Sequence, residues 1–375
     1  MSLANGTKDN DHVEALYAHA FRCMPAIVPM RLRRIQEAFS SFATAWRASA
    51  QELATRLDDP ALASLLSIKT AIAPEEEWEK LLRQHIRVFL ANDNGYPALL
   101  REIAQPPALL YVRCDNLSPF QTPRPTAAIV GSRKMSGYGK IAAHTISAEL
   151  AAAGVIVVSG LAIGIDAAAH EATLGSGTPT WAVLGSGLSR IYPPRNQQLA
   201  SRILAEGGTL ISEYHPTQPA GPHTFPQRNR IIAGLSRLTI VVEAAERSGA
   251  LITARHALEA NRDVAAVPGD IFALQSSGTN ALLRQGATLI RNAGDALELL
   301  GVTLETSTQD PAAATPTLDK SDETAHHILR CLASPRTVEA LQTYTELPAS
   351  LLQQKLTLLE LRGLVRKSGG MFYRK

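Results

Sequence analysis

The sequence predicts an α/β fold in which a doubly wound, mostly parallel sheet follows a small helical N-terminal domain and precedes a domain of three helices and a β-hairpin. Three observations predict it. Apolar side chains recur at helical spacing over residues 12–90, short apolar runs alternate with Ala-rich segments from residue 127, and a Thr-, Ala- and Pro-rich stretch covers residues 302–320. The chain has 375 residues, enough for two or three domains.

The first domain, residues 1–95, is predicted to be helical, with Ile86 and Phe89 in its last helix. Four prolines stand where its helices would start or stop: Pro25, Pro29, Pro60 and Pro74. One interpretation is a SAM- or hairpin-helix-like DNA module. The other is a packing or partner-docking domain, which is favoured at least equally because no GxG hairpin turn with flanking lysines is present.

The central domain, residues 96–301, alternates strands and helices. Strands are expected over residues 127–130, 155–158, 180–184, 209–212, 238–242 and 263–266. Helices are expected over residues 141–152, 167–174, 197–206, 229–235 and 253–260. Strands that are apolar on both faces and separated by helices are typical of a parallel sheet covered on two sides. The sequence therefore predicts a Rossmann-like domain.

Residues 302–320 are predicted to be a linker, because they lack an apolar period. Three helical segments and a strand pair follow, over residues 323–331, 337–344, 348–361, 363–367 and 371–374. This pattern is typical of a winged helix, predicted over residues 321–375. Its third helix has few side chains of base-reading type, so protein docking or regulation is favoured over the reading of duplex DNA.

Composition limits the function classes. The formal net charge is only +3, so a basic surface requires local clustering of charge. The three cysteines lie far apart without a CxxC pair, which supports neither a disulfide framework nor a zinc ribbon and fits a reducing cytosol. The N-terminus is polar, and no apolar stretch reaches the roughly 18 residues of a membrane span. We expect a soluble, cytoplasmic protein without membrane contact and without a metal site.

Glycine-rich turns follow several predicted strands, over residues 131–139, 159–166, 185–187 and 246–250. Ligands of α/β sheets collect at such strand ends, where helix N-termini offer N–H groups to anions. The turns contain no GxGxxG of the usual spacing and no GxxxxGK[ST], so neither a nicotinamide site nor a P-loop is supported and no cofactor is expected. The remaining features favour binding of phosphates.

Basic residues strengthen the phosphate hypothesis. Between residues 128 and 291, 14 Lys and Arg stand against 10 Asp and Glu, a local excess of four. Four arginines fall in or just beyond strand-end turns: Arg133, Arg190, Arg195 and Arg247. Aromatic residues make up only 5% of the chain, and Phe225 is the best candidate for base stacking. A place in the core is its equal alternative.

Arg228 and Arg230 have two interpretations. They bind phosphate, or they brace the sheet by pairing with Glu213 and Glu243. At least one of them is expected to be structural. Arg133 is the stronger candidate for a phosphate contact, because a strand-end turn offers it few other partners.

Asp166 and His170 lie i, i+4 on one helical face, so an acid–base or metal pair is one interpretation. The favoured interpretation has Asp166 capping its helix after Gly164 and His170 packing beneath the loop. No third ligand is evident, and we expect no catalytic residue.

Nine segments resemble the DprA/Smf family of DNA-processing proteins in the same order along the chain: residues 96–100, 106–111, 130–133, 159–166, 191–193, 212–214, 225–232, 248–255 and 278–280. The outer domains match the family only in type. The resemblance implies a single-stranded DNA-binding protein without established catalysis. It also implies that the protein protects incoming DNA and loads the recombinase RecA in natural transformation and recombination, and that it dimerises through its Rossmann-like domain.

The resemblance and the glycine turns together predict a DNA groove of ten residues: Gly131, Ser132, Arg133, Gly160, His223, Phe225, Arg228, Arg230, Ser248 and Gly249. Family members often carry a lysine near His223, so this phosphate contact is expected to be weak near pH 7. Candidates for the dimer face are the apolar residues Ile240, Leu251, Ile271 and Leu274.

Two rival functions remain. One is a nucleotide hydrolase resembling the lysine-decarboxylase-like phosphoribohydrolases. These need a PGGxGTxxE run, and this chain has only Pro268-Gly269-Asp270 and a separate Gly278-Thr279-Asn280, so Glu243 would have to serve. The other is a winged-helix transcription regulator with an effector-binding α/β domain, which would bind specific duplex DNA.

Overall fold

A computed structural model gives the fold and describes residues 3–59, 67–114, 124–302, 323–332, 336–345, 347–361, 364–368 and 371–374. The chain divides into two compact units, Met1–Thr303 and Leu304–Lys375. The predicted linker lies outside the described residues, apart from residue 302. Among the helices that the structure describes, none has the length and apolar character needed to cross a membrane.

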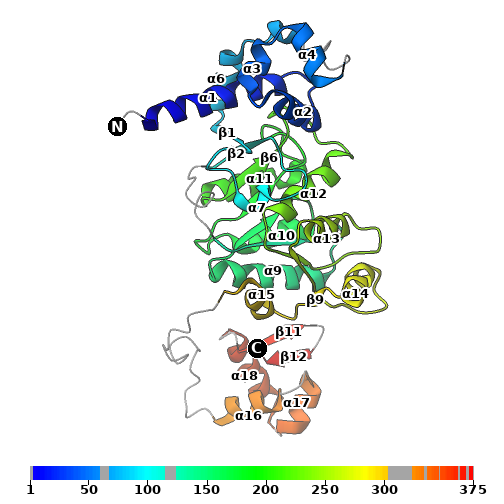
Figure 1. Cartoon of the computed structure of the whole chain (residues 1–375). Coiled ribbons are helices and arrows are strands. Elements are labelled where there is room, and N and C mark those ends of the chain that lie inside the picture. Colours follow the sequence, from blue (N-terminus) through cyan, green and yellow to red (C-terminus); the bar gives the residue numbers. More distant parts are fainter. Residues whose placement is uncertain are drawn as a thin grey trace. The chain divides into compact units, whose positions relative to one another are not determined.

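The first unit is built on a nine-stranded sheet of order β1-β2-β6-β5-β4-β3-β7-β8-β9 (Figure 1). Its strands are β1 (Ile86–Leu90), β2 (Leu109–Arg113), β3 (Thr126–Val130), β4 (Ile156–Ser159), β5 (Trp181–Val183), β6 (Thr209–Ser212), β7 (Leu238–Val241), β8 (Asp263–Ala266) and β9 (Thr288–Leu289). In the sheet, every pair of neighbouring strands from β6 across to β9 is parallel. Only the pairs β1 with β2 and β2 with β6 are antiparallel. The predicted doubly wound, mostly parallel sheet is confirmed.

Helices cover both faces of this sheet, because alternate residues of a central strand enter different cores. In β3, Ala127 and Ile129 pack on the face of α9 (Gly137–Ala152), α10 (Ile165–Thr173) and α15 (Ala293–Leu300). Ala128 and Val130 pack on the face of α12 (Thr224–Gly234) and α13 (Gly249–Glu259). Burial of both faces explains why these strands are continuous apolar runs in the sequence. Two further helices are α11 (Gln197–Ala205) and α14 (Ser277–Arg284).

Helices precede the sheet, as predicted: α1 (Leu3–Arg22), α2 (Pro29–Phe39), α3 (Phe42–Arg47), α4 (Ala50–Leu57) and α6 (Pro74–Arg83). Their core, which includes Phe21, Ile35 and Leu53, is continuous with side chains of the sheet such as Tyr111 of β2. The helical segment therefore packs against the sheet within one unit.

Two expectations are wrong. Ile86 and Phe89 were expected in a helix, but residues 86–90 form β1, which pairs with β2. Their three-residue spacing suits a helical face, yet pairing with a strand about twenty residues later buries both side chains. Ile240 was a candidate for the dimer face, but it is fully buried in β7. The antiparallel edge formed by β1 and β2 was not predicted.

The second unit contains α16 (Glu323–Cys331), β10 (Arg336–Thr337), α17 (Val338–Thr345), α18 (Ala349–Leu361), β11 (Val365–Ser368) and β12 (Met371–Arg374). Strand β12 pairs antiparallel with both β11 and β10. Ile328, Leu341 and Leu352 are buried in its core. The three predicted helices and the terminal hairpin are confirmed, and β10 is an addition to them.

Candidate nucleic-acid interface

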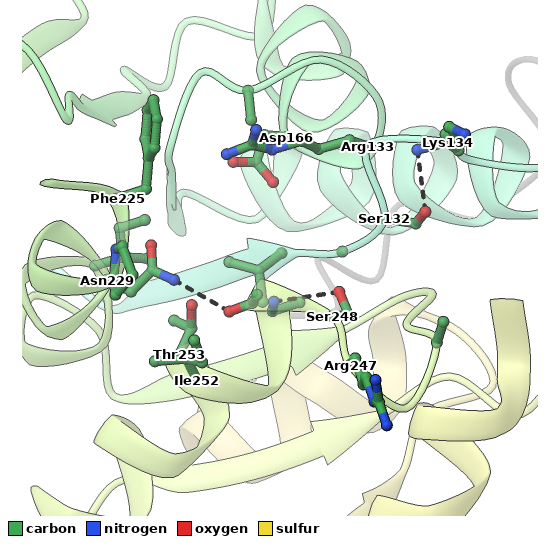
Figure 2. Close-up of a pocket in the computed structure, with 18 of the residues that line it drawn as sticks. Ser132, Arg133, Lys134, Asp166, Phe225, Asn229, Arg247, Ser248, Ile252 and Thr253 are labelled. Atoms are coloured by element: carbon green, nitrogen blue, oxygen red, sulfur yellow. Dashed lines mark hydrogen bonds between the residues drawn. The ribbon is translucent and has the colours of Figure 1, made fainter. Parts of the chain in front are cut away.

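A pocket of about 730 Å³ lies where the turns after β3, β4 and β7 meet (Figure 2). Strands β4, β5 and β6 lie in this order on one side of β3, and the next strand in the sequence, β7, lies on its other side. The strand order therefore reverses at β3. Open α/β sheets bind their ligands in the crevice at such a reversal, beyond the carboxyl ends of the strands.

Seven of the ten predicted site residues line this pocket: Gly131, Ser132, Arg133, Phe225, Arg228, Ser248 and Gly249. The other three, Gly160, His223 and Arg230, are not among its lining residues. The lining also includes polar residues that sequence reasoning did not select, among them Lys134, Asn229, Thr253 and Gln275. Lys134 and Asn229 directly follow the selected residues Arg133 and Arg228, so their positions in the same motifs could have indicated them.

Glu243 fixes the turn after β3. The Ser132 N–H donates to the Glu243 carbonyl oxygen at 2.7 Å, and the Ser136 N–H donates to the Glu243 carboxylate at 2.9 Å. The Ser136 hydroxyl donates to the same carboxylate. A Cβ at Gly131 would lie 2.7 Å from Ile165 and 2.9 Å from the Glu243 carbonyl oxygen, so packing requires this glycine. The Glu243 carboxylate thus holds the turn and is not part of the pocket lining.

Arg133 extends from this turn into the pocket. Its guanidinium carbon lies 4.9 Å from the centre of the Phe225 ring, a cation–π distance. Figure 2 shows the Arg133 side chain reaching toward Asp166, with Phe225 beyond it. The Tyr192 ring packs against Phe225 with centroids 5.5 Å apart. Arg133 is exposed and Phe225 is half-buried, so a cation and part of an aromatic side chain are both accessible to a ligand.

Arg228 lies on the floor of the pocket and is almost completely buried. Its Nη1 donates to the carbonyl oxygens of Gly160, at 2.7 Å, and of Val183. A Cβ at Gly160 would lie 2.5 Å from this guanidinium, so the glycine makes room for the arginine. Burial lowers the pKa of Arg228 to about 10, with Asp166 opposing the shift, and the side chain stays cationic at pH 7.

Asp166 also lines the pocket, and burial raises the pKa of its carboxyl group. Its Oδ2 accepts a hydrogen bond from the Gly160 N–H at 3.1 Å. The expectation that Asp166 caps its helix is wrong, because the N-cap is Gly164 and the carboxylate reaches back to the preceding turn. His170 is fully buried, as expected, with Nδ1 2.8 Å from the Thr180 hydroxyl, and burial lowers its pKa to about 3.

The N-terminus of α13 forms another wall of the pocket. Ser248 is its N-cap and accepts a hydrogen bond from the Ala250 N–H at 3.3 Å. The Asn229 side chain donates to the Gly249 carbonyl oxygen at 3.1 Å (Figure 2). A Cβ at Gly249 would meet no atom within 4 Å, so there is open space beside it. The N–H groups and the dipole at a helix N-terminus attract anions.

Several predicted cations lie elsewhere. Arg230 forms an ion pair with Glu213 through hydrogen bonds of 2.6 and 2.8 Å, so the bracing interpretation holds for Arg230. Arg228 has no such pair with Glu243. His223, Arg190 and Arg195 are exposed and do not line the pocket.

The charged side chains of the pocket lining are four cations, Arg133, Lys134, Arg228 and Arg247, and one carboxylate, Asp166. Three of the cations are exposed, and only Arg228 is buried. The lining therefore combines positive charge, a helix N-terminus and one aromatic ring. This combination is suited to a polyanion that carries bases, because guanidinium groups bind phosphate and rings stack on bases.

Comparison with known proteins places the two units in families. Residues 87–301 match the family of DNA recombination-mediator protein A, and residues 311–371 match the DprA winged helix domain. The chain is 32% identical to protein Smf of Synechocystis over 395 residues, which cover 96% of this chain and 99% of that protein. It is 40% identical to the DNA processing protein DprA of Bacillus subtilis over 218 residues, which cover 58% of this chain and 72% of that protein.

Two solved structures are similar in both fold and sequence. DNA processing protein A of Streptococcus pneumoniae has a TM-score of 0.67 and 33% identity, with 76% of this chain and 97% of that chain covered. DNA processing protein A of Helicobacter pylori has a TM-score of 0.51 and 30% identity, with 57% and 95% covered. The H. pylori structure describes a single-stranded DNA binding mode of that protein.

Proposed function

Because the chain belongs to the DNA recombination-mediator protein A family, also called DprA/Smf, we propose that it binds single-stranded DNA in the pocket at the reversal of its sheet. The observation that carries the proposal is the meeting of exposed Arg133, the Phe225 ring and the N-terminus of α13 in one cationic pocket. The single-stranded DNA binding described for the H. pylori relative supports it.

Each side of the pocket has a role in the proposed contact. Arg133, Lys134 and Arg247 neutralise backbone phosphates, and the release of counterions makes the affinity depend on salt. Phe225 stacks against a base. The α13 N-terminus at Gly249 offers N–H groups to a phosphate. Buried Arg228 holds the pocket floor, so its contribution to binding is indirect.

The test compares a labelled single-stranded oligonucleotide with its own duplex by fluorescence anisotropy on the full chain. We expect tighter binding of the single strand with little dependence on its sequence. Tighter, sequence-specific binding of the duplex would instead favour a winged-helix transcription regulator and would contradict the proposal.

The proposal extends to recombination. As the resemblance implies, the protein protects incoming single-stranded DNA in natural transformation and loads RecA onto it. The family's description as a recombination mediator supports this role. The test measures the lag of RecA filament formation on DNA coated with single-strand binding protein. We expect this chain to shorten the lag, and an unchanged lag at saturating protein would contradict RecA loading.

We also propose a homodimer formed through the loop after β8. Three apolar side chains there are largely exposed: Ile271 at 79%, Phe272 at 90% and Leu274 at 71%. Exposed apolar side chains gathered in one segment are typical of an interface. The mass in solution, measured by light scattering, is expected to be that of a dimer for the wild type and of a monomer for I271D/F272D. A dimer of unchanged stability in this variant would place the interface elsewhere.

The rival hydrolase requires Glu243 to act on a sugar. Its carboxylate is instead bonded to Ser136 beneath the turn after β3. We therefore expect no release of base from nucleoside monophosphates. Turnover that is abolished by Glu243→Gln in a folded variant would establish an enzyme.

A further inference from the structure

A cluster of nitrogen and sulfur donors lies between the helical segment and the sheet, outside the DNA pocket. His19 and Cys23 are one helical turn apart at the end of α1, and His215 follows β6. One donor atom from each residue lies within 4.8 Å of the other two. His215 is 192 residues from Cys23 in the sequence, so no ligand spacing predicted this cluster.

The distances within the cluster match those around a tetrahedral metal ion. The Cys23 Sγ lies 3.7 Å from His19 Nε2 and 3.7 Å from His215 Nε2. With Zn–S of about 2.3 Å and Zn–N of about 2.0–2.1 Å, tetrahedral angles place sulfur and nitrogen about 3.6 Å apart. Both sulfur–nitrogen distances are therefore those of ligands that share one tetrahedral ion.

The Nδ1 atom of each imidazole already has a hydrogen-bond partner. His19 Nδ1 is 2.8 Å from the Tyr111 hydroxyl, and His215 Nδ1 is 3.0 Å from the Thr217 hydroxyl. Such contacts fix the orientation of histidines that bind metal through the other nitrogen.

The Cys23 sulfur is the common partner of both imidazoles, because the Nε2 atoms of His19 and His215 each lie 3.7 Å from it. Sulfur is a weak hydrogen-bonding group, so these contacts contribute little, whereas a cation at their centre would bind all three donor atoms.

We propose that His19, Cys23 and His215 bind one zinc-like divalent metal ion that links α1 to the loop after β6. On binding, the Cys23 thiol loses its proton to solvent and the resulting thiolate, with the two neutral imidazoles, gives three ligands. Water would take the fourth position, because the carboxylate of Glu77 on α6 is already paired with Lys80 at 2.6 Å. Mixed imidazole and thiolate ligands favour zinc and similar ions over magnesium or calcium.

The ion would connect the helical segment to the DNA pocket. Beside His215, Glu213 pairs with Arg230, and the Tyr214 hydroxyl donates to the Thr224 carbonyl oxygen at 3.2 Å. Both contacts reach α12, the helix that carries Phe225. A metal ion bound by α1 and by His215 therefore restrains the segment that positions the proposed stacking residue.

The test titrates Co²⁺ into the full chain after chelator treatment and removal of any polyhistidine tag. We expect one equivalent to bind per chain, with a thiolate-to-cobalt charge-transfer band in the near ultraviolet and displacement by Zn²⁺. The band disappears in C23A and in H215A. It persists in the control C331A, whose cysteine lies in the other unit.

Tyr111→Phe separates a metal site from a merely structural cluster. It removes only the hydroxyl that contacts His19, and we expect Co²⁺ to bind about 10-fold more weakly with the band retained. Circular dichroism of the metal-free variants verifies that each is folded. No charge-transfer band in the wild type, or a band that survives in folded C23A or folded H215A, would overturn the proposal.

Discussion

The arginine on the rim of the DNA pocket and the arginine on its floor differ in exposure and in their partners. Arg133 on the rim is exposed and its guanidinium lies over the Phe225 ring. Arg228 on the floor is buried, donates to the carbonyl oxygens of Gly160 and Val183, and interacts with Asp166. An arginine in a recognition motif therefore either meets the ligand or holds together the loops that meet it, and burial distinguishes the two roles.

Arg228→Ala gives the largest expected effect. It leaves the buried Asp166 carboxylate without its main cationic partner and two carbonyl oxygens without this donor. Because a buried carboxylate is left uncompensated and two buried carbonyl oxygens lose a charged donor, we expect a loss of about 3–5 kcal/mol of unfolding free energy. Urea unfolding measures this loss. In the matched Arg133→Ala variant, we expect a change of about 0.5 kcal/mol or less, because Arg133 is exposed. Equal losses in the two variants would remove the distinction between rim and floor.

Phe225→Leu gives the second-largest expected effect, a loss of affinity for single-stranded DNA. Leucine keeps an apolar side chain beside Gly185, which the Phe225 ring contacts, but has no aromatic face. Loss of one base-stacking contact weakens single-stranded DNA binding by about 1–3 kcal/mol. Anisotropy titrations at fixed salt provide the measurement, and Tyr344→Leu, an exposed tyrosine of the other unit, is the control. Unchanged affinity in Phe225→Leu would assign Phe225 to packing alone.

Gly249→Ala gives the smallest effect. The added methyl group meets no protein atom, so the fold is retained, but it occupies the space beside the N-terminus of α13. We expect single-stranded DNA to bind about 1 kcal/mol more weakly, with no loss of unfolding free energy. Gly137→Ala is the matched control, because Gly137 also begins a helix and has open space, but does not line the pocket. Equal affinities of the two variants would mean that no ligand approaches α13.

The parallel sheet was predictable because its strands are buried on both faces and appear as apolar runs between helices. The edge strand β1 was not, since the spacing of Ile86 and Phe89 also fits a helix and only the distant partner β2 decides between them. In the site, the glycine turns predicted where the pocket lies. They did not predict that Arg228 turns inward, because this depends on the missing side chain of Gly160 and the buried charge of Asp166.

The His19, Cys23 and His215 cluster could not be predicted for a related reason. His19 lies in α1 and Cys23 directly follows that helix, but His215 lies in the loop after β6, almost two hundred residues later in the sequence. Only the packing of the helical segment against the sheet brings them together. Sequence patterns therefore located the site formed by consecutive strand ends and gave no sign of the one formed between segments that are distant in the chain.

The salt dependence of single-stranded DNA binding tests the central claim most directly. Affinities of the wild type, Arg133→Ala and Arg190→Ala are measured across a series of salt concentrations. Each phosphate contact contributes about 0.7 to the slope of log affinity against log salt for single strands. We predict that Arg133→Ala lowers the slope by about this amount, while Arg190→Ala, which changes another exposed arginine outside the pocket, leaves it unchanged. The same slope in Arg133→Ala as in the wild type would contradict the account.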